Sequence, residues 1–446
     1  MNILGNDFNV KSLMKYVLPT ILMMIFMSTY TIVDGLFVAN LVGEDALASV
    51  NMVWPTFNII LAIGLMLATG GTAVMGKLMG EGKSYDARSF LSILYIVATI
   101  LGVLFTTIFL IFPEEILWLL GVDNELYSYA INYLITLSCF NTIFFFQVFV
   151  QSFFVLAGKP ILGFGICFLG GITNIILDYV FISPDILNLG IIGAGLATGI
   201  GNSVPAIFGL LYFSFYRKGT LYFGKPILNI KVLFQSMFNG MSELVSQLAI
   251  AITTLLFNVI LLDIVGKSGV ASITVILYIQ LIQTAIYFGY SMGVAPIISF
   301  KYGANDTKGL KVVLNISFKF IAIISAFVII FSLLFGEFAV AIFISRSSET
   351  FAMAVNGLKI FSIAYLFMGI NVFMSSMFTA LSNGKISAIL SLSRTLVFLV
   401  GALLILPHFF KLNGVWLAVP LAELLACLLS IYYYKKENFT SKKLLM

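Results

Sequence analysis

Four carboxylates stand within long apolar stretches of this 446-residue sequence: Asp34, Asp178, Glu243 and Glu423. A charged carboxylate inside a membrane span is energetically costly, so such a residue usually marks an ion pathway or a coupling site. A carboxylate in this setting can bind a cation or take up and release a proton. The side chains that share a helix face with each acid therefore decide what it can do.

Two of the aspartates have a polar neighbour one helical turn away. Tyr30 precedes Asp34 by four residues in TYTIVDGLFVANLVG, and Asn174 precedes Asp178 by four residues in TNIILDYVFI. Residues at i and i+4 lie on the same helix face. Carboxylate, amide and hydroxyl oxygens suit a hard cation such as Na+, or a titrating proton. The alternative is that both aspartates lie near the outer ends of their helices, within reach of water and lipid headgroups.

Glu243 lies in the segment NGMSELVSQLAI and shares a helix face with Gln247, which makes both residues candidates for the wall of a substrate cavity. The alternative is a single carboxylate hydrogen-bonded to its packing partners. Glu423 and Arg394 are expected to form a structural ion pair in the second half of the chain. Lys359 also falls in an apolar stretch, and no partner is assigned to it.

The elements that position these residues are expected to be transmembrane helices. Hydrophobic residues make up 61% of the chain and charged residues only 10%, whereas soluble domains carry roughly 25% charged residues. Apolar runs of about twenty residues, which suffice to cross a ~30 Å hydrocarbon layer, follow one another along the chain. The sequence predicts an all-α integral membrane protein with twelve transmembrane helices, at residues 14–39, 51–79, 88–112, 126–157, 160–183, 191–216, 232–262, 270–300, 309–335, 350–381, 386–407 and 414–434.

Basic residues indicate the orientation, because Lys and Arg gather on the cytoplasmic side of membrane proteins. With the N-terminus inside, 19 of the 24 Lys and Arg residues fall in inner loops and tails, and only Lys267, Arg346 and Lys411 fall in outer loops. Adding or removing one helix would destroy this bias. Both termini are therefore expected to be cytoplasmic.

The chain divides near its middle at the longest basic connection, RKGTLYFGKPILNIK. We predict an N-terminal six-helix lobe at 1–216, a cytoplasmic inter-lobe linker at 217–231 and a C-terminal six-helix lobe at 232–446. With six helices each, the lobes are expected to be related by a pseudo-two-fold axis along the membrane normal, with a cavity between them. Weak sequence matches support this repeat: Gly70, Gly80 and Arg88 with Gly293, Gly303 and Lys311, Gly158-Lys159 with Gly384-Lys385, and GAGLAT from Gly193 with GVWLAV from Gly414.

Catalytic chemistry is not expected. The single His408 and the three cysteines form no cluster of nucleophile, acid–base residue or metal ligands with the carboxylates. We therefore expect no enzyme activity, no cofactor, and no metal apart from Na+ at Asp34 and Asp178. Membrane orientation explains the basic residues, so no nucleic-acid partner is expected. A monomer is the expected state.

The segments that carry the carboxylates resemble those of the multidrug and toxic compound extrusion (MATE) transporters. Within that family, the MepA-like branch of Gram-positive bacteria is the most similar. The resemblance covers essentially the whole chain, through VDGLFVANLVGEDALASV, AGKP, TNIILDYVFI and GIIGAGLAT. It implies a twelve-helix, two-lobed antiporter in a bacterial cell (inner) membrane, which exports cationic or amphipathic drugs in exchange for H+ or Na+ and supports antibiotic resistance.

The resemblance also assigns residues. It implies a cation site in the N-terminal lobe at Asp34, Asn174, Asp178 and Thr198, and it places three further residues in the lining of that lobe's cavity: Tyr30, Tyr133 and Gln151. Some Na+-coupled members carry a glutamate midway along the seventh helix. This chain has Leu248-Ala249-Ile250 there, which argues against a second-lobe cation site of that type.

The expected function is secondary active multidrug efflux by alternating access between the two lobes. The alternatives are a flippase of a lipid-linked precursor and an exporter of an endogenous metabolite. A flippase would favour a cationic cavity for pyrophosphate, whereas only Lys359 and Arg394 are embedded against four acids. The balance of charge therefore favours small organic cations as cargo.

Overall fold

The computed structural model of the chain describes residues 3–437, which form helices and turns and include no β-strand. The predicted inner residues Lys442 and Lys443 lie outside this described part. The first half contains η1 (Ile3–Gly5), α1 (Val10–Leu41), α2 (Glu44–Gly80), α3 (Ser84–Ile111), α4 (Pro113–Leu119), α5 (Tyr127–Ser138), α6 (Asn141–Leu156), α7 (Pro160–Ile182) and α8 (Gly190–Phe215).

The second half contains α9 (Ile230–Asn239), α10 (Met241–Val265), α11 (Lys267–Gly303), α12 (Thr307–Phe343), α13 (Glu349–Phe361), η2 (Ser362–Ala364), α14 (Tyr365–Ala380), α15 (Gly384–Leu392), the π-helical η3 (Ser393–Phe398) and α16 (Leu399–Lys436). We refer to α1–α8 as the N-lobe and to α9–α16 as the C-lobe. Between them, residues 216–229 have no helix and are held on α3, where the Arg88 guanidinium donates to the Tyr222 hydroxyl at 2.7 Å and Ser92 Oγ donates to the Gly224 carbonyl at 2.9 Å.

The number of membrane spans follows from these helices. Ten helical stretches of the described chain are each long and apolar enough to cross a membrane, and the pair α5 and α6, bent by 60°, adds an eleventh. The stretch Gly384–Lys436 holds two spans, because Lys411 breaks it with a φ of 49° and a ψ of −128°. The fold is therefore all-α with twelve transmembrane helices in two six-helix bundles, which confirms the predicted class.

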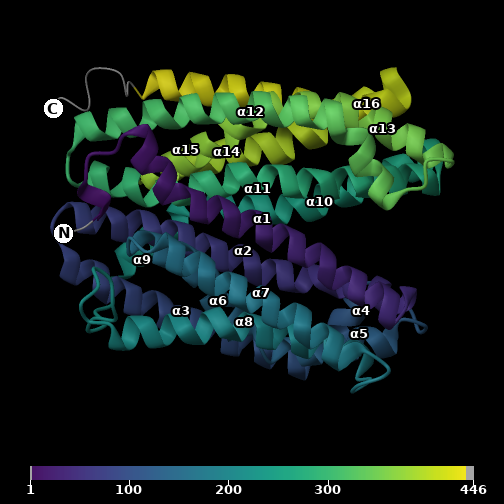
Figure 1. The fold of residues 1–446 in the computed structure, drawn as a ribbon, viewed down its shortest axis with the longest axis horizontal. Helices are drawn as coiled ribbons and strands as arrows, with labels where there is room; N and C mark the ends of the chain where they lie inside the picture. Colours follow the sequence, from purple (N-terminus) through teal and green to yellow (C-terminus); the bar gives the residue numbers. More distant parts are fainter. Residues whose placement is uncertain (1–2, 438–446) are drawn as a thin grey trace.

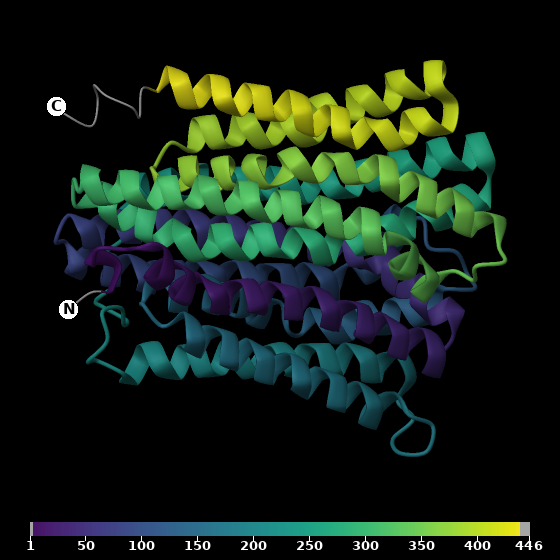
Figure 2. The ribbon, with the colours of Figure 1, turned by 45° about the horizontal axis from the view of Figure 1, so that its top comes forward.

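The helices run side by side along the long axis of the molecule, with the N-lobe below and the C-lobe above in Figure 1. The start of α1 and the end of α16 lie at the same end of the bundle, which we call the terminal end. Helix α1 of the N-lobe packs along α11 of the C-lobe, and α2 packs along α9 and α10 (Figure 2). The two lobes therefore meet through their first two long helices.

Residues with positive φ recur at matching turns of the two lobes, which confirms the internal repeat. A positive φ is strained for side chains other than glycine, so its recurrence marks equivalent turns. The Gly158 turn matches Ser382, which lies two residues before the Gly384 position expected from sequence. The four pairs are Gly43 with Gly266, Gly82 with Asn305, Gly158 with Ser382, and Gly190 with Lys411.

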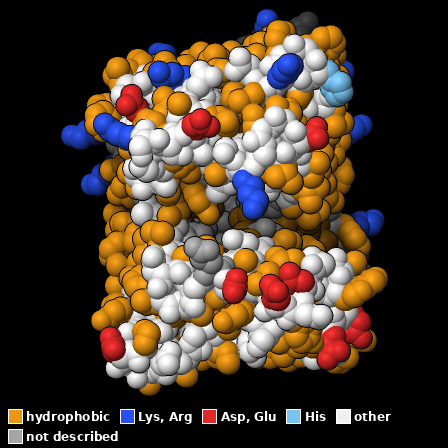
Figure 3. Space-filling model, turned by 90° about the vertical axis from the view of Figure 1, so that its right-hand side faces the viewer, with side chains coloured by type: hydrophobic (Ala, Val, Ile, Leu, Met, Phe, Trp, Pro, Cys, Tyr) orange, Lys and Arg blue, Asp and Glu red, His pale blue; other side chains and the backbone are white. Residues whose placement is uncertain are grey.

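The two ends of the interface between the lobes differ. At the terminal end the helices touch closely: a Cβ built on Gly76 of α2 would lie 2.0 Å from Ser299 Oγ of α11. At the opposite end the surface is hollowed between the two lobes, as Figure 3 shows. The structure is thus closed at the terminal end and open at the other.

Two predicted single helices are broken. The span expected at 126–157 bends between α5 and α6, and the span expected at 232–262 is interrupted at Gly240 between α9 and α10. At Gly240 the cause is contact between the lobes, since a Cβ there would lie 2.0 Å from the Met66 carbonyl oxygen. The short α4 was not predicted; Pro113 occupies its first turn, where the missing N–H is tolerated.

Candidate cation site and inter-lobe pocket

Helices α1 and α7 bring Asp34, Asn174 and Asp178 together on one side of the N-lobe. Glycine permits this approach, because a Cβ on Gly171 of α7 would lie 2.4 Å from the Phe26 ring of α1. Gly201 of α8 likewise leaves room for Asn174 of α7. A Cβ built on Gly201 would lie only 2.6 Å from the Cβ of Asn174. Glycines in α7 and α8 therefore allow the helices to pack closely around the acids.

The polar atoms of this group lack hydrogen-bond partners among the described residues. Asp178 and Asn174 are fully buried, Thr198 is nearly so, and Asp34 is partly exposed. Asp34 lies beside Asp178 and Asn174, yet none of them forms a hydrogen bond of normal geometry. The unpartnered buried atoms are Asp34 Oδ1, Asn174 Oδ1 and Nδ2, Asp178 Oδ1 and Oδ2, and Thr198 Oγ1.

Unpaired buried polar groups are costly, and two carboxylates side by side disfavour double ionisation. A cation or a shared proton between them would satisfy both requirements. The donor set consists of hard oxygens, which suits Na+ or H+. The four residues that the resemblance assigned to a cation site thus each carry a buried polar atom without a hydrogen-bond partner.

A pocket adjoins this group in the N-lobe. Tyr30, Asn174 and Thr198 belong to its lining, whereas Asp34 and Asp178 do not. Gln147 lines the pocket one turn before the predicted Gln151, which is buried without lining it. The full lining is Met27, Tyr30, Gln147, Cys167, Gly170, Gly171, Asn174, Thr198, Gly201, Asn202 and Pro205.

Tyr30 and Tyr133 both lie near the two aspartates. Tyr133 is buried and packs edge to face on Phe57, so its ring helps to close this side of the site. Sequence reasoning missed Gln147 and Asn202. The signal that could have found them is the same one that identified the acids, namely a strongly polar side chain within an apolar helix.

A second pocket lies between the lobes and contains Glu243. Glu243 is partly exposed to it, and its carboxylate forms no hydrogen bond or ion pair with another described residue. The predicted Gln247 lies outside the lining. Besides Glu243, the wall is made of hydroxyl and apolar side chains: Thr69, Thr72, Ala73, Ser152, Met292, Ala295, Ser376, Thr379 and Ala380.

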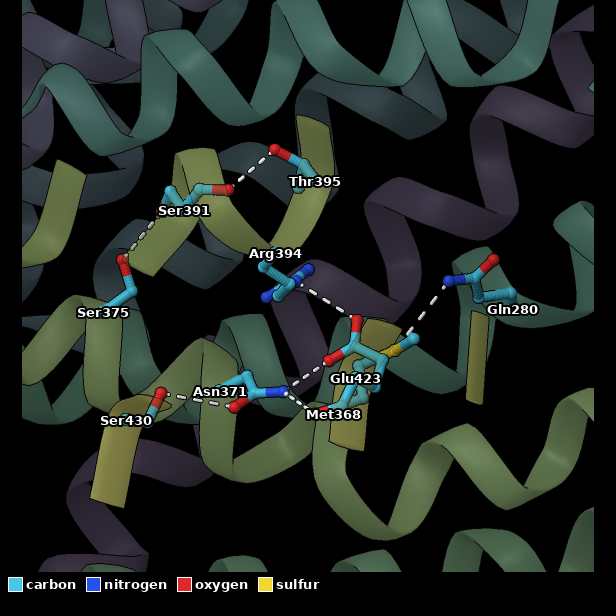
Figure 4. A network of polar contacts seen from close by, with 9 residues as sticks. All are labelled: Gln280, Met368, Asn371, Ser375, Ser391, Arg394, Thr395, Glu423 and Ser430. Carbon is cyan, nitrogen blue, oxygen red and sulfur yellow. Dashed lines mark hydrogen bonds and ion pairs between the residues drawn. The ribbon is translucent and has the colours of Figure 1, made fainter. Parts of the chain in front are cut away.

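The predicted ion pair between Arg394 and Glu423 is confirmed. Arg394 Nε lies 3.1 Å from Glu423 Oε1 in the interior of the C-lobe (Figure 4). The Asn371 amide donates to Glu423 Oε2 at 2.6 Å and to the Glu423 carbonyl at 2.8 Å, and Ser430 Oγ donates to Asn371 Oδ1 at 3.4 Å. Lys359 is exposed in the last turn of α13, where a cation stabilises the helix dipole.

Comparison with known proteins agrees with this structure. A family model described as MatE matches residues 19–180 and 243–404, one stretch in each lobe. The chain belongs to this family, the MATE transporters, and is therefore a transporter of the multidrug efflux family rather than an enzyme.

Its relatives include Multidrug export protein MepA of Staphylococcus haemolyticus (strain JCSC1435), 27% identical over 440 residues, which cover 97% of this chain and 95% of the relative. Multidrug export protein MepA of Staphylococcus aureus (strain bovine RF122 / ET3-1) is 26% identical over 443 residues, with 96% and 95% covered. The chain is thus a MepA-like member of the family.

Among solved structures, the fold matches an outward-facing multidrug resistance MATE family transporter of the MOP superfamily. The TM-score is 0.91 at 23% identity, over 97% of this chain and 96% of that one. A crystal structure of MATE in complex with MaL6 matches with the same TM-score and identity, over 97% of both chains. This likeness supports the two-lobed fold.

Proposed function

We propose that the protein is a secondary active exporter of cationic or amphipathic organic compounds, which exchanges them for H+ or Na+ by alternating access between its lobes. The observation that carries this proposal is the pair of unpartnered carboxylates, Asp34 and Asp178, beside an N-lobe pocket. The names of the MepA relatives, which are multidrug export proteins, support the same class of cargo.

In the proposed cycle the terminal end faces the cytoplasm, in a bacterial cell membrane, and the protein acts as a monomer. H+ or Na+ enters from the open end and binds at Asp34 and Asp178, and cargo is released as their charge is neutralised. The lobes then rock, and the terminal end opens. One cation that moves inward gains ~2.3 kcal/mol per 100 mV, which can sustain roughly a fifty-fold gradient of an uncharged cargo.

The inter-lobe pocket is the proposed place of the cargo's positive charge. Glu243 is its charged lining residue, and no Lys or Arg belongs to the described lining. Hydroxyl groups from both lobes can accept hydrogen bonds from an ammonium group. A pyrophosphate-linked lipid would meet a carboxylate here instead of a cation, so the pocket favours cationic cargo over the flippase alternative.

Ethidium efflux from vesicles that contain the purified protein tests the proposal, with a pH gradient and a Na+ gradient imposed separately. We expect one gradient to drive ethidium transport in the wild type, and we expect no transport by Asp178→Asn. Gradient-independent transport, or normal transport by the variant, would contradict antiport at this site. Asp185→Asn, in an exposed loop, serves as the control for the same substitution away from the pocket.

A further inference from the structure

The repeat places the C-lobe ion pair at the position of the N-lobe pocket. The turns at Gly158 and Ser382 set an offset of 224 residues, and those at Gly190 and Lys411 set an offset of 221. Gly170, ten residues after the start of α7, then corresponds to Arg394, ten residues after the start of α15. By the same offsets Gln147 corresponds to Asn371, and Asn202 corresponds to Glu423.

All three N-lobe members of these pairs line the N-lobe pocket, and all three C-lobe members belong to the network of Figure 4. In the N-lobe, a Cβ on Gly170 would already lie 2.8 Å from the Gly201 carbonyl oxygen, so α7 and α8 pack backbone to backbone. In the C-lobe the corresponding segment is the π-helical η3, in which no residue is fully buried. This local widening makes room for the arginine side chain.

The charges of the two lobes consequently differ. Among the described residues no Lys or Arg forms an ion pair with Asp34 or Asp178, whereas each oxygen of the Glu423 carboxylate has a partner: Arg394 on Oε1 and Asn371 on Oε2. Glu423 is almost fully buried and Arg394 is largely so. The other acid near Arg394 is Glu243, which faces it from α10. A mobile cation in the C-lobe would have to compete with a guanidinium tethered at the same place.

We propose that Arg394 is a built-in cation, which permanently occupies the C-lobe position that corresponds to the N-lobe pocket beside Asp34 and Asp178. Removal of its side chain creates a guanidinium-sized cation site at Glu423 and Asn371. The wild-type protein then has one exchangeable cation site, in the N-lobe. Only this last statement rests on the proposed function, because the tethered cation is a property of the C-lobe alone.

The test measures the Tm of purified protein in detergent, with and without a millimolar concentration of ethylguanidinium. Arg394→Ala should lower the Tm, because Glu423 is left buried and unpaired, and ethylguanidinium should restore it by about 5 °C. The wild type should not respond. The double variant Arg394→Ala/Glu423→Gln is the matched control: it has no unpaired charge, so it should be more stable than the single variant and should not respond either.

A folded Arg394→Ala variant that does not respond to ethylguanidinium would overturn the proposal, and so would an equal response in the double variant, since a simple loss of packing would affect both alike. If Arg394→Ala cannot be purified, Arg394→Ser also removes the charge and leaves the space of the guanidinium open, and the same outcomes apply. Tm does not depend on transport, so failure of ethidium efflux and failure of this inference are distinguishable.

Discussion

Gly80, at the end of α2, lies directly against the carbonyl oxygen of Phe300 in α11: a Cβ built on this glycine would come within 2.1 Å of that oxygen. The reciprocal contact also exists, since a Cβ on Gly303 would lie 2.1 Å from the Lys77 carbonyl oxygen. Gly80 and Gly303 are repeat-related, as are Lys77 and Phe300. The closed terminal end is therefore a symmetric contact of backbone on backbone, which forms only if both positions are glycine.

A leucine at Gly80 should prevent this closure. The backbone oxygen of Phe300 cannot move without α11, so we expect Gly80→Leu to hold the lobes apart at the terminal end and to abolish alternating transport. Labelling should detect the change: in a background without the three native cysteines, a Ser299→Cys probe is buried in the closed contact. It should react with a membrane-impermeant maleimide at least about tenfold faster in the Gly80→Leu variant, which corresponds to about 1.4 kcal/mol.

The matched control is Gly401→Leu, because no atom lies within 4 Å of a Cβ built there. This variant should transport normally and leave the Ser299→Cys probe protected. Equal protection of the probe in the Gly80→Leu and Gly401→Leu variants would show that the terminal end tolerates a side chain at the contact, and the interpretation of the glycine pair would be wrong.

The paired carboxylates of the N-lobe make a second prediction. Without a bound cation they are buried, adjacent and unpartnered, so removal of one charge should stabilise the protein while it destroys coupling. Asp178→Asn should raise the Tm by about 3–5 °C in cation-free buffer and should lose any stabilisation that Na+ gives to the wild type. Differential scanning fluorimetry measures both effects.

Asp185→Asn again supplies the comparison, since Asp185 lies in an exposed loop. Its Tm and its response to Na+ should equal those of the wild type. A Tm of Asp178→Asn below that of the wild type would mean that Asp178 holds the fold together through its charge, and that the site is structural.

Much of this architecture was predictable because apolar length and the distribution of basic residues are properties of single segments. The shared face of Asn174 and Asp178 was accessible for a similar reason, since it follows from helix periodicity, whereas their grouping with Asp34 was an expectation from the family resemblance. The break at Lys411 was also predicted, as the loop between 407 and 414, but the break at Gly240 was not, because it lies at a contact between helices that are far apart in sequence. Likewise, the equivalence of Gly170 and Arg394 emerges only from the turn geometry that fixes the repeat.

The turn between α11 and α12 supports a pH-dependent prediction. The buried Lys301 ammonium donates to Asp306 Oδ2 at 2.6 Å, and the Gly309 N–H donates to Asp306 Oδ1 at 2.8 Å. The hydrogen bond from Lys301 is the main reason why the pKa of Asp306 is lowered. The stability that it confers is therefore present above the unfolded-state pKa of about 3.9 and is lost as the pH falls through the lower folded-state value.

We expect Asp306→Asn, which keeps the helix cap and removes the charge, to have a Tm a few degrees below that of the wild type at pH 7. The two Tm values should converge when the pH falls below about 3.9. Thermal unfolding at a series of pH values checks this, with Asp86→Asn in the exposed first turn of α3 as the control. A gap that persists in acid would assign the effect to lost packing instead of to the ion pair.

Glu243 supports the prediction that bears most directly on cargo. It lies in the inter-lobe pocket without a partner, so its charge is available to a cationic ligand. Glu243→Gln keeps the size and polarity of the side chain but removes the attraction. We expect the KM for ethidium export to rise about tenfold, which corresponds to about 1.4 kcal/mol, while the KM for an uncharged amphipathic compound stays the same.

Vesicle transport assays with matched charged and uncharged cargo measure this difference, and Glu349→Gln, on the exposed first turn of α13, controls for a general loss of charge. An equal rise in KM for both cargoes would show that Glu243 shapes the pocket without recognising charge. Unchanged kinetics for both would place the cationic group of the cargo elsewhere, and the N-lobe pocket beside Asn174 would then be the site to test, because its unpartnered polar atoms are the other candidates to bind a cation.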